Sequence, residues 1–332
     1  MPKKKGWIIW LIIFLAVIVL AVAYYYGAVR EESDREPASY SVILYQNMDN
    51  EWATLLEGVG QAEEDYKVNV NYITMGAGAT PEEQMEILKR EADNGVDGII
   101  LAATDSEKTG ELLEELNPQV PVITVETGVE SSGESYARIA ANDYEMGYAL
   151  GEIILGDIAE DDGPRAVTVI REYMERDSVR LRFQGLMDAL EDCEEEIKVD
   201  FISRSEGDFN LSLLIGASFH FSSPYIAALD KFCTESAAAA WESKKADFES
   251  NGYSAKIYGI GNTAQTVNDL DNERIRALVF QNEFNMGYEG IRALAEKEKK
   301  GYFPDEFDIR YKIVTRDTLY EPENERLLFP NV

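Results

Sequence analysis

The sequence predicts an α/β protein whose two lobes each contain a doubly wound parallel sheet. Short apolar runs, typical of strands buried on both faces, alternate with amphipathic stretches typical of helices. The alternation passes through two successive series, and a similar segment follows the end of each series. Because strands that alternate with helices form parallel sheets covered on both faces, two series predict two lobes.

Residues 94–127 form the clearest strand–helix–strand unit of the first series. The apolar run 96–103 predicts a buried strand, and the polar segment 104–106 can accept hydrogen bonds from the first amides of the next helix. The run 122–125 predicts a second buried strand, which ends on a charge, Glu126. Since ligands of open α/β sheets bind at the carboxyl ends of the strands, we expect the binding site at this edge.

The other elements continue the alternation. Further strands are expected, in chain order, at residues 41–45, 68–73, 136–140, 166–170, 197–202, 225–230 and 256–260. Further helices are expected after a cap at Asp49 or Asn50, from Pro81 to about Asn94, from Tyr144, and at 178–192, 209–219 and 234–248. The second of these has the clearest start, because Thr80 suits the cap, Pro81 suits the first turn and Glu83 completes a capping box.

Two segments of the sequence echo one another. Residues 142–148 read Asn-Asp-Tyr-Glu-Met-Gly-Tyr, and residues 282–288 read Asn-Glu-Phe-Asn-Met-Gly-Tyr. One explanation is that both segments open similar helices, each of which needs a capping residue, an aromatic residue and a glycine. The other, which we favour, is that the chain crosses between the lobes at these two places, because each copy sits where a series of strands ends.

The amino terminus predicts one transmembrane helix. Lysines at residues 3–5 precede an apolar run over residues 7–23, and tyrosines follow at 24–26. A helix from the first tryptophan to the last tyrosine would be about 30 Å long, which matches the hydrocarbon core of a bilayer. The lysines should stay in the cytoplasm. We therefore expect residues 1–29 to be a short cytoplasmic start and a lipid-embedded anchor, and the charged residues 30–38 to be a tether to a domain outside.

A cleaved signal peptide is the alternative, with Ala21, Val22 and Ala23 as the small-residue cleavage site. The apolar run is long for that purpose, because the apolar region of a signal peptide usually has about 7 to 15 residues. We therefore expect the anchor to stay on the protein.

Composition excludes several classes of function. The formal net charge of the 332 residues is -31, so the phosphates of a nucleic-acid partner would be repelled. Cys193 and Cys233 suggest no disulfide framework, and free thiols are expected rather than a bridge between them. His220 stands between two phenylalanines and is expected to be packed rather than catalytic. No metal-ligand spacing, phosphate loop or dinucleotide glycine pattern occurs, so neither a cofactor nor an enzyme is predicted.

With these segments identified, the chain resembles the type I periplasmic binding proteins, in particular the sugar-binding branch that includes ribose-binding protein. The resemblance extends to the ligand domain of lac-repressor-type regulators. It covers residues 40–320 and is carried by the segments 94–106, 120–126, 142–147, 281–287 and 313–319. It implies two Rossmann-like lobes, joined by a hinge of three crossovers, that close on a small molecule. The lobes would be residues 39–141 plus 283–305, and residues 142–282 plus 306–332.

The resemblance also implies a set of ligand-binding residues, which are Trp52, Glu126, Arg180, Phe209, Asn262 and Gln281. Trp52 would stack on the apolar face of a sugar ring, although its place on the apolar face of a helix also suits core packing. Glu126 would accept hydrogen bonds from hydroxyl groups. Arg180 would hold two ligand oxygens, while Arg182 is expected to face outward. Phe209 would be a second aromatic contact, and Gln281 a ligand contact from the hinge.

Two positions depart from the family pattern. The family has an asparagine-aspartate pair near Cys233 and Thr234, and an aspartate at Gly261, so Asn262 is the nearest replacement acceptor. The expected function is a membrane-anchored, extracytoplasmic solute-binding protein that closes on a small, sugar-like solute. Its partner would be an ABC permease or a sensor histidine kinase. The alternative is a degenerate binding fold that acts as a protein-interaction module without a solute.

Overall fold

The computed structural model describes residues 7, 10, 13–20, 36–46, 48–76, 78–130, 136–203, 210–219, 223–303 and 307–328. The chain divides into two compact units, Met1–Ala38 and Ser39–Val332. In the first unit, residues 13–20 are helical. Part of the predicted membrane segment 7–23 lies outside the described residues, and no described helix is both long and apolar enough to cross a bilayer.

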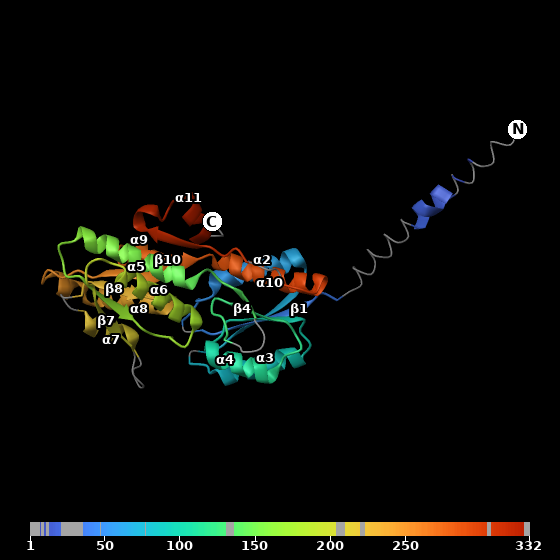
Figure 1. Cartoon of the computed structure of the whole chain (residues 1–332), viewed down its shortest axis with the longest axis horizontal. Coiled ribbons are helices and arrows are strands. Elements are labelled where there is room, and N and C mark those ends of the chain that lie inside the picture. The colour runs from blue at the N-terminus through green and yellow to red at the C-terminus, as the bar shows by residue number, and fades with distance from the viewer. Residues whose placement is uncertain are drawn as a thin grey trace. The chain divides into compact units, whose positions relative to one another are not determined.

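The first lobe is built on a five-stranded parallel sheet. Its strands are β1 (Ser39–Leu44), β2 (Asn69–Thr74), β3 (Gly98–Leu101), β4 (Val122–Val125) and β5 (Ala137–Ile139), in the order β2-β1-β3-β4-β5. Helices α3 (Pro81–Asp93) and α4 (Ser106–Leu116) lie side by side on one face, and α2 (Ala53–Tyr66) and α10 (Glu283–Lys300) lie together on the other (Figure 1). β3 and β4 are buried along their whole length, as their apolar sequences predict.

The second lobe is built on a six-stranded sheet. Its strands are β6 (Ala166–Ile170), β7 (Lys198–Ile202), β8 (Tyr225–Ala228), β9 (Lys256–Ile260), β10 (Ala277–Gln281) and β11 (Tyr311–Thr315), in the order β11-β10-β9-β8-β6-β7. All pairs are parallel except β10 with β11. Its helices are α5 (Asp143–Glu160), α6 (Asp177–Glu191), α7 (Leu211–Ser218), α8 (Lys231–Glu249) and α9 (Ala264–Asp271). A 3-10 turn, η1 (Arg316–Thr318), and α11 (Pro322–Leu328) follow β11.

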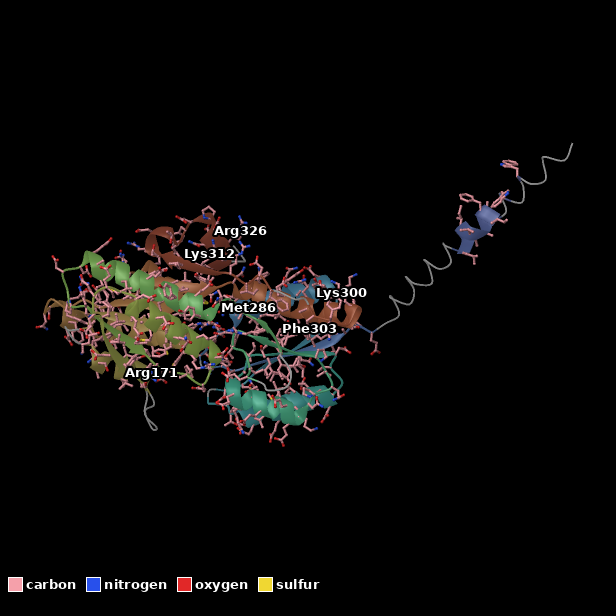
Figure 2. The ribbon with its side chains drawn as sticks, viewed as in Figure 1. Arg171, Met286, Lys300, Phe303, Lys312 and Arg326 are labelled. Carbon is pink, nitrogen blue, oxygen red and sulfur yellow. The ribbon has the colours of Figure 1, made fainter. Side chains whose placement is uncertain are left out.

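The two sheets share one strand order, because β7-β6-β8-β9-β10 of the second matches β2-β1-β3-β4-β5 of the first. In each case the helix after the fifth strand packs in the other lobe. α5 follows β5 and packs on α6, while α10 follows β10 and packs on α2. The echoed segments 142–148 and 282–288 therefore open the two helices that are exchanged between the lobes. In Figure 2, Met286 marks the first turn of α10 near the other lobe, and Lys300 marks its far end.

The residues of the echo have matching tasks. The side chains of Asn142 and Asn282 each accept a hydrogen bond from the third amide of the helix that follows. Asp143 and Glu283, the first residues of those helices, are both buried acids. A buried carboxylate is tolerated only where a cation pairs with it. These two acids therefore mark where ion pairs join the lobes.

Glycines permit the close crossing of the exchanged helices. A Cβ atom on Gly287 of α10 would lie 2.0 Å from the carbonyl oxygen of Leu55 in α2, and one on Gly58 of α2 would lie 1.9 Å from that of Phe284. The same holds in the second lobe, where a Cβ on Gly147 of α5 would lie 1.9 Å from the carbonyl oxygen of Arg182. The backbones therefore touch at both crossings, which explains the glycine of the echo.

Some boundaries differ from the sequence expectations. α2 begins at Ala53, because Asn50 has a left-handed backbone (φ 57°) and cannot start the helix. Trp52 is therefore the residue before the helix and not a member of its apolar stripe. α8 begins at Lys231, three residues before the expected start, because the Asp230 side chain caps it. Neither Cys193 nor Cys233 forms a disulfide, and His220 lies outside the described residues.

Candidate functional site

A layer of buried polar and charged side chains lies between the two lobes, at the carboxyl ends of both sheets. We call it the seam, and its members are Tyr45, Trp52, Glu126, Asp143, Arg176, Arg182, Asp230, Lys231 and Glu283. Each of them is less than 10% exposed. Charged side chains are seldom buried unless they are paired, so the seam must be held by specific partners across the lobes.

Glu126 of the first lobe lies at the centre of the seam. Its Oε2 accepts a hydrogen bond from the Tyr45 hydroxyl at 2.9 Å, and its Oε1 lies 3.5 Å from Nη2 of Arg182 in the second lobe. Burial alone would raise the pKa of Glu126, but Lys231, Arg182 and the Tyr45 hydroxyl lower it below its ordinary value. The carboxylate is therefore charged at neutral pH.

The backbone of Glu126 is held in a strained form. Its φ is 61°, in the left-handed region that costs a residue with a side chain about 1 to 2 kcal/mol. Arg138 holds this turn, because its Nη2 and Nε donate to the Glu126 carbonyl oxygen at 2.6 and 3.1 Å. Strained residues of this kind cluster at ligand-binding sites, where the surrounding structure fixes them.

Arg182, and not Arg180, is the arginine that reaches the centre. Arg182 is 1% exposed, donates from Nε to Asp143 at 2.7 Å and from Nη1 to the Leu229 carbonyl at 3.3 Å. The expectation that Arg182 faces outward is wrong. It lies on the buried face of α6 with Val179 and Leu186, one turn away on either side.

Arg180 lies at the rim of the lobe boundary. Its side chain is 47% exposed, it pairs with Asp177 at 2.6 Å in its own helix, and it contacts Glu130 of the first lobe. The structure therefore does not bring Arg180 to Glu126.

Lys231 of α8 crosses from the second lobe to the first. Its ammonium lies 2.8 Å from Oε1 of Glu283, donates to the Glu51 carbonyl oxygen at 2.8 Å, and lies 4.7 Å from the centre of the Trp52 ring. A carboxylate, a carbonyl and an aromatic face together form an ammonium cage. Burial alone would lower the pKa of Lys231, but Glu283 and Glu126 raise it above its usual value, so the side chain is charged.

Aromatic rings hold the second cation of the seam. The Arg176 guanidinium lies 3.7 Å from the centre of the Tyr45 ring and 4.2 Å from that of Tyr173. Tyr45 in turn meets the Trp52 ring edge-on at 5.0 Å, and the Trp52 indole donates to the Tyr45 carbonyl. Tyr173 has a left-handed φ of 56°. The stacking face of Trp52 is thus in contact with Lys231, and the face of Tyr45 with Arg176.

Backbone contacts tie the lobes together beside the seam. The amide of Ser106 donates to the Glu175 carbonyl at 3.0 Å, and the amide of Asp177 donates to the Ser106 hydroxyl at 2.8 Å. The amide of Ser178 donates to the Thr127 hydroxyl at 3.3 Å. The start of α6 in the second lobe is therefore bonded to the ends of β3 and β4 in the first.

Several buried polar atoms beside these contacts have no hydrogen-bond partner among the described residues. They include the hydroxyls of Thr104 and Ser178 and Nη2 of Arg182. Buried polar atoms are nearly always paired, so the hydroxyls of Thr104, after β3, and of Ser178, in the first turn of α6, are exceptions that a solute could satisfy.

The remaining predicted residues lie in different places. Gln281 is buried and its side-chain oxygen accepts a hydrogen bond from the Ala141 amide at 3.0 Å, so it joins the two chain crossings. Asn262 is buried after β9, at the boundary between the lobes. Phe209 lies outside the described residues. The Thr234 hydroxyl donates to the carbonyl oxygens of Asp230 and Ile260 inside the second lobe, so it is used for packing within that lobe.

Sequence reasoning missed seven members of the seam, which are Tyr45, Asp143, Arg176, Arg182, Asp230, Lys231 and Glu283. Asp230 and Lys231 follow directly after β8, so the rule that strand ends carry the site could have found them. No signal of that kind marks Arg176, whose partners come from both lobes. Among the described residues, no three acidic, histidine or cysteine side chains converge as metal ligands.

Comparison with known proteins gives a consistent result. The family described as "Periplasmic binding protein domain" matches residues 41–301 of the chain. None of the curated proteins compared with the chain matches it.

Solved structures share the fold over most of the chain. A carbohydrate transporter solute-binding protein from Agrobacterium radiobacter, in complex with D-arabinose, is 19% identical with a TM-score of 0.76, over 89% of this chain and 100% of that one. GanP, a glucose-galactose binding protein from Geobacillus stearothermophilus, is 19% identical with a TM-score of 0.70, over 86% and 100%. A sugar-binding protein of a sugar ABC transporter from Bacillus halodurans is 20% identical with a TM-score of 0.68, over 85% and 99%.

Proposed function

Because the chain belongs to the periplasmic binding protein family, we propose that it is an extracytoplasmic receptor that holds a small polar solute at the seam between its lobes. One observation carries the proposal. Charged and hydrogen-bonding side chains from both lobes meet at the carboxyl ends of both sheets, where ligands of such sheets bind.

The seam offers what a polyhydroxylated solute needs. The carboxylate of Glu126 can accept hydrogen bonds, the guanidinium of Arg182 can donate them, and the Trp52 ring can cover an apolar face. Sugars are the first solutes to test, because relatives with the same fold are described as sugar-binding or were solved with D-arabinose. In this proposal Glu126 and Arg182 take the central polar contacts, while Arg180, Asn262 and Gln281 act at the rim and the hinge.

The proposal places the binding unit outside the membrane. The apolar run 7–23 after three lysines would anchor the chain in the lipid with its start in the cytoplasm. The partner would be an ABC permease, which would carry the solute inward, or a sensor histidine kinase, which would carry the signal. The described chain segments between the lobes, at 140–142, 281–283, 301–303 and 307–310, would act as the hinge.

A second candidate function is a protein-interaction module without a solute. The observation that favours it is that the recognition side chains of one lobe are bound by those of the other, with Lys231 on Trp52 and Arg182 on Glu126. Closed lobes of this kind would present a constant surface to a partner protein.

Solute binding should stabilise the full-length chain in detergent. A bound solute at a hundred times its dissociation constant adds about 2.7 kcal/mol, which raises the melting temperature measurably. D-Arabinose, D-glucose and D-galactose form the first panel. Glu126→Gln should weaken the binding of a hit by about tenfold or more, because a charge-assisted hydrogen bond contributes about 1.5 to 3 kcal/mol.

Glu111→Gln is the control, because the Glu111 side chain is 60% exposed and pairs with Lys108 of its own helix, away from the seam. Equal loss in both variants would show that Glu126 has no special place in the site. A panel of sugars, amines and other small metabolites that leaves the melting temperature unchanged would favour the interaction module.

A further inference from the structure

A groove of about 660 Å³ lies beside the seam, between the start of α2 in the first lobe and α9 in the second. This volume is within the range of small-molecule sites, which is roughly 300 to 1,000 Å³. Glu51 and Glu283 line the groove on the side of the seam. These two residues also bind the Lys231 ammonium, so the groove opens directly beside the ammonium cage.

The groove is strongly acidic. Its described lining contains five carboxylates and neither lysine nor arginine, and the carboxylates are Asp49, Glu51, Glu57, Glu235 and Glu283. Three helices, α2, α9 and α10, begin at the groove, and each amino terminus amounts to roughly half a positive charge. Lys231 offsets Glu283, and Glu51 lies within reach of the charges of Lys231 and Arg176, so three carboxylates, Asp49, Glu57 and Glu235, remain against about 1.5 positive charges. The negative charge of the carboxylates therefore exceeds the positive charge of the helix termini, and the groove attracts cations.

One side chain of the second lobe, Asn262, points to a ligand independently of this charge. Asn262 is 5% exposed and lines the groove, yet in the described part of the chain its amide makes no hydrogen bond. Glu235 has one oxygen bonded to the Thr263 hydroxyl. Burial raises the pKa of Glu235, and a cation in the groove would favour its charged form.

The seam shows that these walls can hold an ammonium group. The side chain of Lys231 is bound there by a carboxylate, a backbone carbonyl and an aromatic ring, with the two hydrogen-bonded distances both 2.8 Å. A metal ion is a poorer fit to the same lining, because no three carboxylates converge among the described residues.

We propose that this groove selects a small organic solute that carries an ammonium group, such as an amino sugar or a polyamine. The ammonium would lie against Glu235 and Glu57, and Asn262 would hydrogen-bond to a polar group beside it. This inference rests on the proposed function, since it names the chemical class of the solute that the receptor takes.

The test compares D-glucosamine with D-glucose, which differ by one amine in place of a hydroxyl, and adds spermidine as an extended amine. Binding to the full-length chain in detergent is measured by calorimetry at mildly acidic pH, where the amines are protonated. We expect D-glucosamine or spermidine to bind at least tenfold more tightly than D-glucose. The double variant Glu57→Gln, Glu235→Gln should weaken that binding by about tenfold or more, while Glu111→Gln on the exposed side of α4 should leave it unchanged.

Several results would overturn the inference. If D-glucose binds as tightly as D-glucosamine, the receptor function stands and the amine class is wrong. If an amine binds but the double variant binds it equally well, the site of selection lies elsewhere. If calcium chloride stabilises the chain as much as the amines do, any cation neutralises the carboxylates of the groove, and the groove does not select an ammonium group. If none of the probes binds, the amine class is wrong, and the sugar panel above decides the receptor function separately.

Discussion

Replacing Gly58 by alanine should destabilise the protein by about 3 kcal/mol, since overpacking a close helix crossing costs typically 1 to 3 kcal/mol and sometimes more. The added Cβ would lie 1.9 Å from the carbonyl oxygen of Phe284, and 2.7 Å from its carbonyl carbon. Both are backbone atoms, so α2 and α10 would have to separate. The measurement is urea unfolding of residues 39–332, which form a compact unit of their own.

Gly60→Ala is the matched control in the same helix. A Cβ on Gly60 meets nothing within 4 Å. Alanine also has the higher helix propensity, so this change should stabilise the protein by about 1 kcal/mol. Opposite signs for the two variants would support the crossing. Equal small effects would mean that α2 and α10 do not pack closely in solution.

Replacing Arg182 by methionine should cost about 3 to 5 kcal/mol, because breaking a buried ion pair leaves an unpaired buried charge. The variant would leave Arg138 as the one cation paired with the fully buried carboxylate of Asp143, and would remove one of the cations that stabilise the charge of Glu126. Burial already raises the pKa of Asp143 above its ordinary value despite Arg182 and Arg138, so without Arg182 it should take up a proton. The variant should therefore lose least stability at acidic pH, where that proton is readily supplied.

Arg180→Met is the control for this prediction. Arg180 lies two residues away in the same helix, and its ion pairs are exposed. Exposed pairs contribute about 0 to 1 kcal/mol, so little stability should be lost. Adding Asp143→Asn to Arg182→Met should restore part of the loss. Comparable losses in Arg180→Met and Arg182→Met would mean that Arg182 is not buried as described.

The sequence was sufficient for the α/β class and the two lobes with parallel sheets, because its apolar and amphipathic patterns alternate regularly. Short apolar runs such as 122–125 favour buried strands, and the echo at 142–148 and 282–288 marks the start of both exchanged helices. Predictions from local patterns of this kind hold because each pattern depends only on the residues of its own segment. The antiparallel strand β11 has no continuous apolar run in its sequence, since three of its five residues are only partly buried.

The site was harder to predict, because its members are chosen by partners far away in the chain. Helical spacing places Arg182 with Val179 and Leu186, which could have indicated burial. An arginine on an apolar stripe is nevertheless unexpected until Asp143, 39 residues earlier, is known to meet it. Trp52 shows the same limit. Its pairing with Lys231 joins residues from different lobes, and no local pattern contains both.

The charged nature of the seam has a calorimetric consequence. Hydration of apolar surface raises the heat capacity, by about 0.45 cal/K/mol per Å², whereas hydration of polar surface lowers it by about 0.26. The core of each lobe is apolar, so its unfolding must carry a large positive heat-capacity change. Separation of the lobes would instead expose Glu126, Arg182, Lys231 and Glu283 together with the rings of Trp52 and Tyr45. The two contributions oppose one another, so opening and closing of this protein would be nearly silent in heat capacity while its unfolding is not.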